Sequence, residues 1–177
     1  NVYPGSQIPF GGIQISPDTD MDFYDAAAGY KYDHGTLLGF SLTHLSGTGI
    51  PDLGDFLFMP GTGEIHLDPG THDDPDSGYR SRYSHEEEWC SPNYYAVNLL
   101  DYGVKAEMTS SLHSGILRFT YPEAEDSFIL LDLDHTLWWN CAWSNIRIED
   151  EHTLTGYKLV KGWGPERHIY FTAEFSK

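Results

Sequence analysis

The chain has 177 residues, of which 40% are hydrophobic and 21% charged, so it is long enough to bury a core and is typical of a globular domain. Its 10 Lys and Arg residues against 27 Asp and Glu residues give a formal net charge of −17, which disfavours binding to nucleic acid or to an anionic membrane surface. No run of residues approaches the roughly 20 apolar residues of a membrane-spanning helix, and we expect no membrane span.

Short apolar runs recur between turn residues along the whole chain, a pattern typical of β-strands. In chain order we expect strands at Gly12–Ser16, Leu37–Thr43, Phe56–Met59, Glu64–Leu67, Tyr94–Leu100, Val104–Ser110, Ile116–Tyr121, Phe128–Leu133, Ile146–Glu149, Thr153–Leu159 and Ile169–Ser176. Two hairpins are predicted, one around the turn Asp101-Tyr102-Gly103 and one between the runs that end at Glu149 and begin at Thr153. No segment has a helical stripe longer than a turn or two. The pattern predicts an all-β fold, an antiparallel β-sandwich with few or no helices.

Two long stretches, Pro17–Asp33 and Asp68–Pro92, lack a regular pattern and are rich in Asp, Gly, Pro, Ser and Tyr. Long loops in compact domains are usually functional or disordered. The chain ends at Glu174–Lys177 in sequence that is still strand-like. We therefore expect the natural polypeptide to continue.

The densest group of polar residues and glycines follows the second predicted strand. Hydroxyl, imidazole and carboxylate groups hydrogen-bond sugar hydroxyls, and glycines let the backbone approach a ligand closely. An ordinary Ser/Gly turn is the alternative. A phosphate loop is excluded because no Lys-Ser/Thr ending is present, and a serine-hydrolase elbow because Ser46 lacks the Gly-x-Ser-x-Gly context. The candidate substrate-binding residues are His44, Ser46, Gly47, Thr48, Gly49, Asp52 and Asp55.

Three other groups have functional and structural interpretations. Asp18–Asp22 begins like an EF-hand loop but has Phe23 at the glycine position, so only a less regular calcium site stays open. His85–Glu88 sets an imidazole beside carboxylates, yet adjacent glutamates usually face water, which favours a structural role over catalysis. Trp138, Trp139 and Trp143 are candidates for a stacking platform, although packing in a core or a domain interface is the stronger interpretation. Cys90 and Cys141 could form a disulfide or remain free thiols.

Together these segments resemble glycoside hydrolase family 92, the calcium-dependent exo-α-mannosidases, nearly from end to end. The resemblance rests on Asn1–Gly5, Pro9–Gly11, Ser16–Thr19, Gly29–Asp33, Gly39–Ser41, Thr43–Gly49, Gly54–Asp55, Met59–Pro60, Ser84–Glu86, Tyr94–Tyr95, Tyr170–Phe171 and Glu174–Ser176. Thr43–Gly49 is its most specific element. Leu42 departs from a histidine common in the family, which implies that one polar contact is lost. Ile50-Pro51 lies where members vary, in the part of the loop that the resemblance places beside the leaving-group sugar.

The resemblance implies that residues 1–177 are the N-terminal domain, a large β-sandwich of the supersandwich type, followed by a catalytic (α/α) barrel. It implies an inverting hydrolysis of terminal α-linked mannose, with a mannose-containing glycan as substrate and Ca²⁺ held mostly by the barrel. The catalytic acid and base would also lie there, so we expect no catalytic residue and no metal ligand in this chain. A secreted, periplasmic or cell-surface enzyme is implied. The alternatives are a free-standing carbohydrate-binding module and a complete β-sandwich enzyme that acts through His85–Glu88.

Overall fold

The structure, a computed structural model of the chain, describes residues 2–22, 24–47, 49–123 and 126–176. These residues form fourteen β-strands and two 3₁₀-helices of three residues each, and all pairings between the strands are antiparallel. Among them no helix is long and apolar enough to cross a membrane. The predicted all-β antiparallel fold is confirmed.

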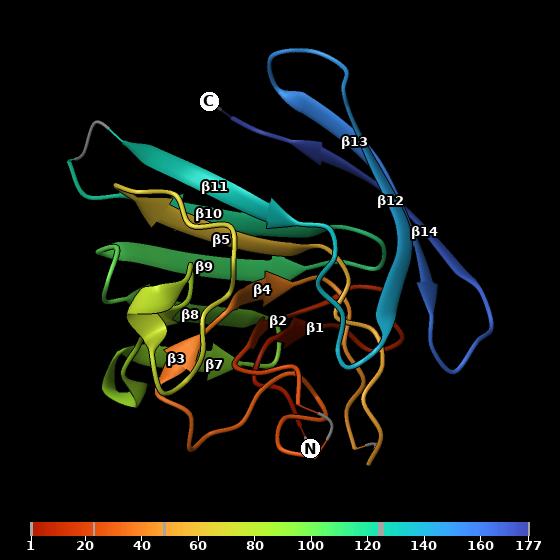
Figure 1. Ribbon diagram of the computed structural model, residues 1–177, viewed down its shortest axis with the longest axis horizontal. Helices are drawn as coiled ribbons and strands as arrows, with labels where there is room; N and C mark the ends of the chain where they lie inside the picture. The colour runs from red at the N-terminus through yellow and green to blue at the C-terminus, as the bar shows by residue number, and fades with distance from the viewer. Residues whose placement is uncertain (1, 23, 48, 124–125, 177) are drawn as a thin grey trace.

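Two sheets form a β-sandwich (Figure 1). The first sheet has the order β1-β2-β4-β5-β11, with bounds Ser6–Gln7, Gln14–Asp18, Gly39–Ser41, Leu57–Thr62 and Ser127–Asp132. The second has the order β10-β9-β8-β7, with bounds Gly115–Thr120, Val104–Ser110, Tyr94–Leu99 and Glu88–Ser91. Apolar side chains from both sheets, such as Phe40 and Met59 from the first and Tyr95 and Met108 from the second, belong to one buried core.

The β8–β9 hairpin agrees with the sequence in both its turn and its pattern. Gly103 in the turn has a φ of 63°, a conformation that glycine adopts without strain. Along β9, Val104, Ala106 and Met108 are buried while Lys105 is exposed. The alternation therefore directs one face of β9 into the core.

Two predicted strands are wrong in detail. Leu37–Thr43 is two strands, because the chain leaves a small sheet of β3 (Thr36–Leu37) and β6 (Ser81–Arg82) and enters the first large sheet at β4. Gly39 at this crossing has a φ of 147°, and its backbone comes close to the carbonyl of Phe58. Glu64–Leu67 is not a strand; β5 ends at Thr62, and Ile65 and Leu67 are exposed.

The rest of the chain forms shorter elements and a third sheet. The stretch expected to be irregular after Asp68 contains η1 (Pro75–Ser77), β6, η2 (His85–Glu87) and β7. The third sheet is β12 (Asn140–Ile148), β13 (Thr153–Lys161) and β14 (Arg167–Glu174), and it contains the predicted second hairpin. Figure 1 shows this sheet, in blue, rising beside the sandwich. Cys90 on β7 and Cys141 on β12 are free thiols.

Candidate functional site

The predicted substrate-binding residues lie in one connection, residues 42–56 between β4 and β5, which we call the β4–β5 loop. In Figure 1 this loop extends at the lower right, beside the connection from β11 to β12. The structure divides the predicted set into two groups. Ser46, Gly47 and Gly49 are exposed at the tip, whereas His44, Asp52 and Asp55 are buried. Thr48 lies outside the described residues.

His44 anchors the start of the loop through buried polar contacts. Its Nδ1 donates to the carbonyl oxygen of Gln14 over 2.7 Å, and its Nε2 lies 2.7 Å from Oδ1 of Asp18. The second carboxylate oxygen of Asp18 lies 2.8 Å from Nε2 of His135, which follows β11. The side chains of Asp18, His44 and His135 are 0% exposed. This buried cluster joins three segments that are distant in the sequence.

The electrostatics of the cluster keep Asp18 ionised. Burial alone would raise the pKa of Asp18, but the charge of His44 and the hydrogen bonds from both histidines outweigh burial and lower the pKa below its usual value. Gly29 makes room for the pair: it has a φ of 84°, and a Cβ there would stand 2.0 Å from Oδ1 of Asp18. Neither Asp18 nor His135 was among the predicted site residues, because only the fold brings them to His44.

Asp55 anchors the end of the loop against the third sheet. Its Oδ2 accepts hydrogen bonds from Thr43 Oγ1 at 2.8 Å and from Nη1 of Arg167 at 2.5 Å. Nζ of the buried Lys158 stands 3.6 Å from the other carboxylate oxygen. Burial lowers the pKa of Lys158, and the Asp55 carboxylate works against that shift. The Asp55 carboxylate therefore neutralises the positive charges of Lys158 and Arg167. We expect it to affect a ligand by holding the loop in position.

Asp52 connects the loop to the turn between β13 and β14. Its carboxylate accepts from the backbone N–H of Leu53 at 2.7 Å and of Trp163 at 3.4 Å, and from Nη2 of Arg167 at 3.3 Å. A Cβ on Gly162 would stand only 2.9 Å from this carboxylate. Trp163 and Arg167 carried no signal in the sequence, because a turn between two strands does not reveal which loop it meets.

The predicted tryptophan platform is divided between two places. Trp139 donates its indole N–H to the carbonyl oxygen of Pro51 over 2.8 Å, so Trp138 and Trp139 border the β4–β5 loop. Trp138 is 53% exposed, and Trp163, whose backbone N–H bonds Asp52, is 60% exposed. Trp143 instead packs on Tyr157 of the third sheet, with ring centroids 5.2 Å apart. The contacts of Trp139 and Trp163 with the loop are therefore at Pro51 and Asp52, in the half of the loop that leads to β5.

The side chains of His85 and Glu88 are bonded to each other and to neighbouring tyrosines. His85 Nδ1 lies 2.6 Å from Oε2 of Glu88, and the His85 ring is stacked on Tyr32 at 3.9 Å between centroids. The hydroxyls of Tyr30 and Tyr95 both donate to Glu88, at 3.0 and 2.7 Å. The Glu88 carboxylate is thus held by three neighbours, an arrangement that favours the structural interpretation of this group.

The carboxylates around the loop do not fit a calcium ion. Ca²⁺ takes six to eight oxygen ligands. Both oxygens of Asp18 face histidines, and Asp52 and Asp55 pair with Arg167 and Lys158. Among the described residues of the β4–β5 loop, the carboxylates of Asp52 and Asp55 are therefore both occupied by ion pairs.

Known proteins resemble the chain over nearly its whole length. The model of the glycosyl hydrolase family 92 N-terminal domain matches residues 1–177. A solved family GH92 α-mannosidase from Bacteroides thetaiotaomicron is 76% identical, superposes with a TM-score of 0.98 over 99% of this chain, and has also been solved with mannoimidazole. A family GH92 inverting mannosidase from Bacteroides thetaiotaomicron VPI-5482 is 26% identical, with a TM-score of 0.75 over 97% of this chain.

These relatives are much longer than the chain. It covers 24% of the first solved structure and 22% of the inverting mannosidase. An uncharacterized secreted glycosidase of Arthroderma benhamiae is 29% identical over 132 residues, which are 69% of this chain and 16% of that protein. The chain therefore corresponds to about a quarter of the solved relatives.

Proposed function

The chain belongs to glycosyl hydrolase family 92, as its N-terminal domain, and we propose that it is the substrate-facing sandwich of an exo-acting α-mannosidase. The observation that carries this proposal is the 76% identity to a solved α-mannosidase across 99% of the chain. The substrate class is a glycan with terminal α-linked mannose. The mannoimidazole complex of that relative supports a mannose-like ligand.

The chemistry belongs to another part of the polypeptide. An inverting glycosidase needs a carboxylic acid to protonate the leaving oxygen and a carboxylate to activate water on the opposite face. The acidic residues of the β4–β5 loop are occupied by ion pairs, as described above, and the solved relatives continue far beyond the matched region. We therefore assign the acid, the base and the bound Ca²⁺ to a following (α/α) barrel domain. When bound, Ca²⁺ would hold and distort the terminal mannose.

Within this chain, the tip and the base of the loop have different tasks. Ser46, Gly47 and Gly49 are exposed, and in this proposal they are the residues that contact the sugar. His44, Asp52 and Asp55 are positioning residues, because each is buried and bonded within the domain. Export from the cytoplasm is part of the proposal, and the secreted Arthroderma relative supports it.

The assignment of the tip is tested by removing one exposed hydroxyl. In the full polypeptide, Ser46→Ala should lower kcat/KM on an α-mannobioside by about 2- to 10-fold, the range for one lost hydrogen bond. Ser91→Ala, at another exposed serine on β7, is the matched control and should leave kcat/KM unchanged. Equal kcat/KM for wild type and Ser46→Ala would remove Ser46 from the sugar-binding surface.

A further inference from the structure

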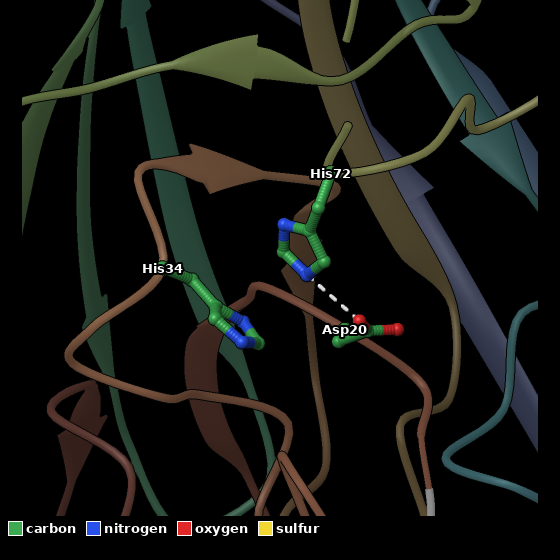
Figure 2. A group of neighbouring side chains, drawn as sticks. All are labelled: Asp20, His34 and His72. Carbon is green, nitrogen blue, oxygen red and sulfur yellow. Dashed lines mark ion pairs between the residues drawn. The ribbon is translucent and has the colours of Figure 1, made fainter. Parts of the chain in front are cut away.

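A second polar cluster lies away from the β4–β5 loop, and the proposed function does not use it. Asp20 follows the end of β2, His34 precedes β3, and His72 lies in the connection between β5 and η1. Figure 2 shows the three side chains converging from these separate segments. One carboxylate oxygen and one nitrogen from each ring all lie within 4.8 Å of one another.

The spacing is close to that of a metal site. Nε2 of His72 stands 2.7 Å from Oδ2 of Asp20, and the rings of His34 and His72 have centroids 4.0 Å apart. Ligand atoms that share an ion at bond lengths of about 2.0–2.2 Å stand roughly 3–3.5 Å apart. Nε2 of His72 is also buried without a well-directed hydrogen bond. Small side-chain adjustments would therefore bring three donors onto one ion.

Neighbouring groups hold the candidate ligands in place. The other oxygen of Asp20, Oδ1, accepts from the backbone N–H of Met21 at 2.6 Å, which turns Oδ2 toward His72. His34 contacts Thr19 Oγ1 at 3.0 Å through Nδ1 and Asp25 Oδ2 at 2.8 Å through Nε2. Whichever nitrogen of His34 binds an ion, the other keeps a partner. Histidines that bind metals are held in this way, by a hydroxyl, carbonyl or carboxylate on the second nitrogen.

The two nitrogens of His72 have different neighbours. Thr36 Oγ1 lies 3.2 Å from Nδ1, and Nε2 is the nitrogen that faces Asp20. Arg80 lies 3.1 Å from Nδ1 of His72 and adds positive charge, so it weakens the attraction for any cation.

The donor set selects the class of ion. Two imidazole nitrogens and one carboxylate suit Zn²⁺ and similar transition metals, whereas Ca²⁺ prefers oxygen ligands. Asp18, the first residue of the acidic run that resembled a calcium loop, is turned into the core toward His44. We propose that Asp20, His34 and His72 bind one divalent transition-metal ion, which joins the segments that precede β3 and η1.

The test is metal titration of the full polypeptide after treatment with a chelator. Calorimetry with Zn²⁺ should show that His34→Gln/His72→Gln loses one binding event or weakens it at least tenfold relative to wild type, the loss expected when ligands are removed. His152→Gln is the matched control, because His152 is exposed and lies outside the cluster. Identical Zn²⁺ binding by wild type and the double variant would overturn the proposal.

Two further measurements keep the test decisive if the double variant fails to fold. Asp20→Asn changes one partly exposed carboxylate and should also weaken Zn²⁺ binding at least about tenfold. Co²⁺ added to the wild type should give the visible absorption of a site with nitrogen ligands, and that absorption should be lost in Asp20→Asn. Absence of this absorption in wild type, or Ca²⁺ binding that depends on Asp20 without Zn²⁺ binding, would overturn the assignment.

Discussion

Asp18 joins two histidines that are far apart in the sequence, His44 at the start of the β4–β5 loop and His135 after β11. All three side chains are fully buried, and the Asp18 carboxylate is bonded to both histidines. An isolated charge in a protein interior is costly unless it is paired. We therefore regard Asp18 as the residue that fixes the base of the loop.

Replacing Asp18 tests this role. Asp18→Asn should reduce the free energy of unfolding by about 3 kcal/mol, because removing one partner of a buried ion pair leaves the other without compensation. Urea unfolding followed by tryptophan fluorescence measures the change. Asp73→Asn, at an exposed carboxylate, should change the stability by less than about 0.5 kcal/mol. A stability of Asp18→Asn equal to that of Asp73→Asn would show that the buried cluster is dispensable.

Glu107 on β9 provides a test by pH. Hydrogen bonds from Arg118 and Tyr94 lower the pKa of Glu107 to about 2, from a usual value of 4.5. A lowered pKa in the folded state means stabilisation that is complete above pH 4.5 and is lost as the pH falls toward 2. Wild type should therefore be more stable than Glu107→Gln at pH 7, with the difference disappearing near pH 2. Thermal unfolding across this range measures it, and a constant difference would contradict the assignment.

Single residues show why part of the site could be predicted and part could not. The run from His44 to Asp55 was recognisable because polar residues and glycines are concentrated there. His135, Lys158 and Arg167 reach this loop only through the packing of later strands, and nothing in their local sequence marks them. The burial of Asp55 was likewise invisible, since an aspartate in a glycine-rich loop is usually exposed.

At the scale of elements, the β4–β5 loop is held between the β11–β12 connection and the β13–β14 turn. The backbone N–H of Leu137 donates to the carbonyl of Leu53 over 3.0 Å, and Gly54 packs directly on Leu137. A Cβ on Gly54 would stand 2.7 Å from Cγ of Leu137. These contacts hold the end of the loop against the β11–β12 connection.

Alanine variants of Gly54 and Gly63 distinguish the effect of the Leu137 contact on stability from the effect of backbone strain. Gly54 and Gly63 have similar positive φ angles, 75° and 82°, but only Gly54 has neighbours within 4 Å of an added Cβ. Both alanine variants should lose about 1 kcal/mol from strain, and Gly54→Ala should lose about 1–3 kcal/mol more because Leu137 must move. Chemical denaturation compares them. Equal losses would mean that the loop does not depend on its contact with Leu137.

Elements with a clear turn and alternation, such as the β8–β9 hairpin, were predictable from local sequence. Leu37–Thr43 was not, because its division into β3 and β4 depends on the pairing of β3 with β6, a strand more than forty residues later. Glu64–Leu67 has apolar residues in a strand-like spacing, but β5 ends before it and those residues face outward. The bounds of such strands depend on the strands they pair with, and the pairing cannot be derived from the local sequence.

At the scale of the whole molecule, we propose that the domain presents a binding surface on the β-sandwich and that the rest of the polypeptide supplies the reacting groups. The described strands supply most of the core, and buried ion pairs hold the start and the end of the β4–β5 loop. The match to the N-terminal domain of family 92 and the greater length of the solved relatives agree with this arrangement. The central claim is therefore that this chain forms part of the substrate-binding surface and that a following domain carries the catalytic groups.

Proton NMR of mannose release from an aryl α-mannoside, with Ca²⁺ present, tests this claim most directly. The full polypeptide should release β-mannose first, because an inverting reaction changes the anomeric configuration. Residues 1–177 alone, shown to be folded by circular dichroism, should release none. Mannose release by residues 1–177 alone, or α-mannose as the first product of the full polypeptide, would contradict the account.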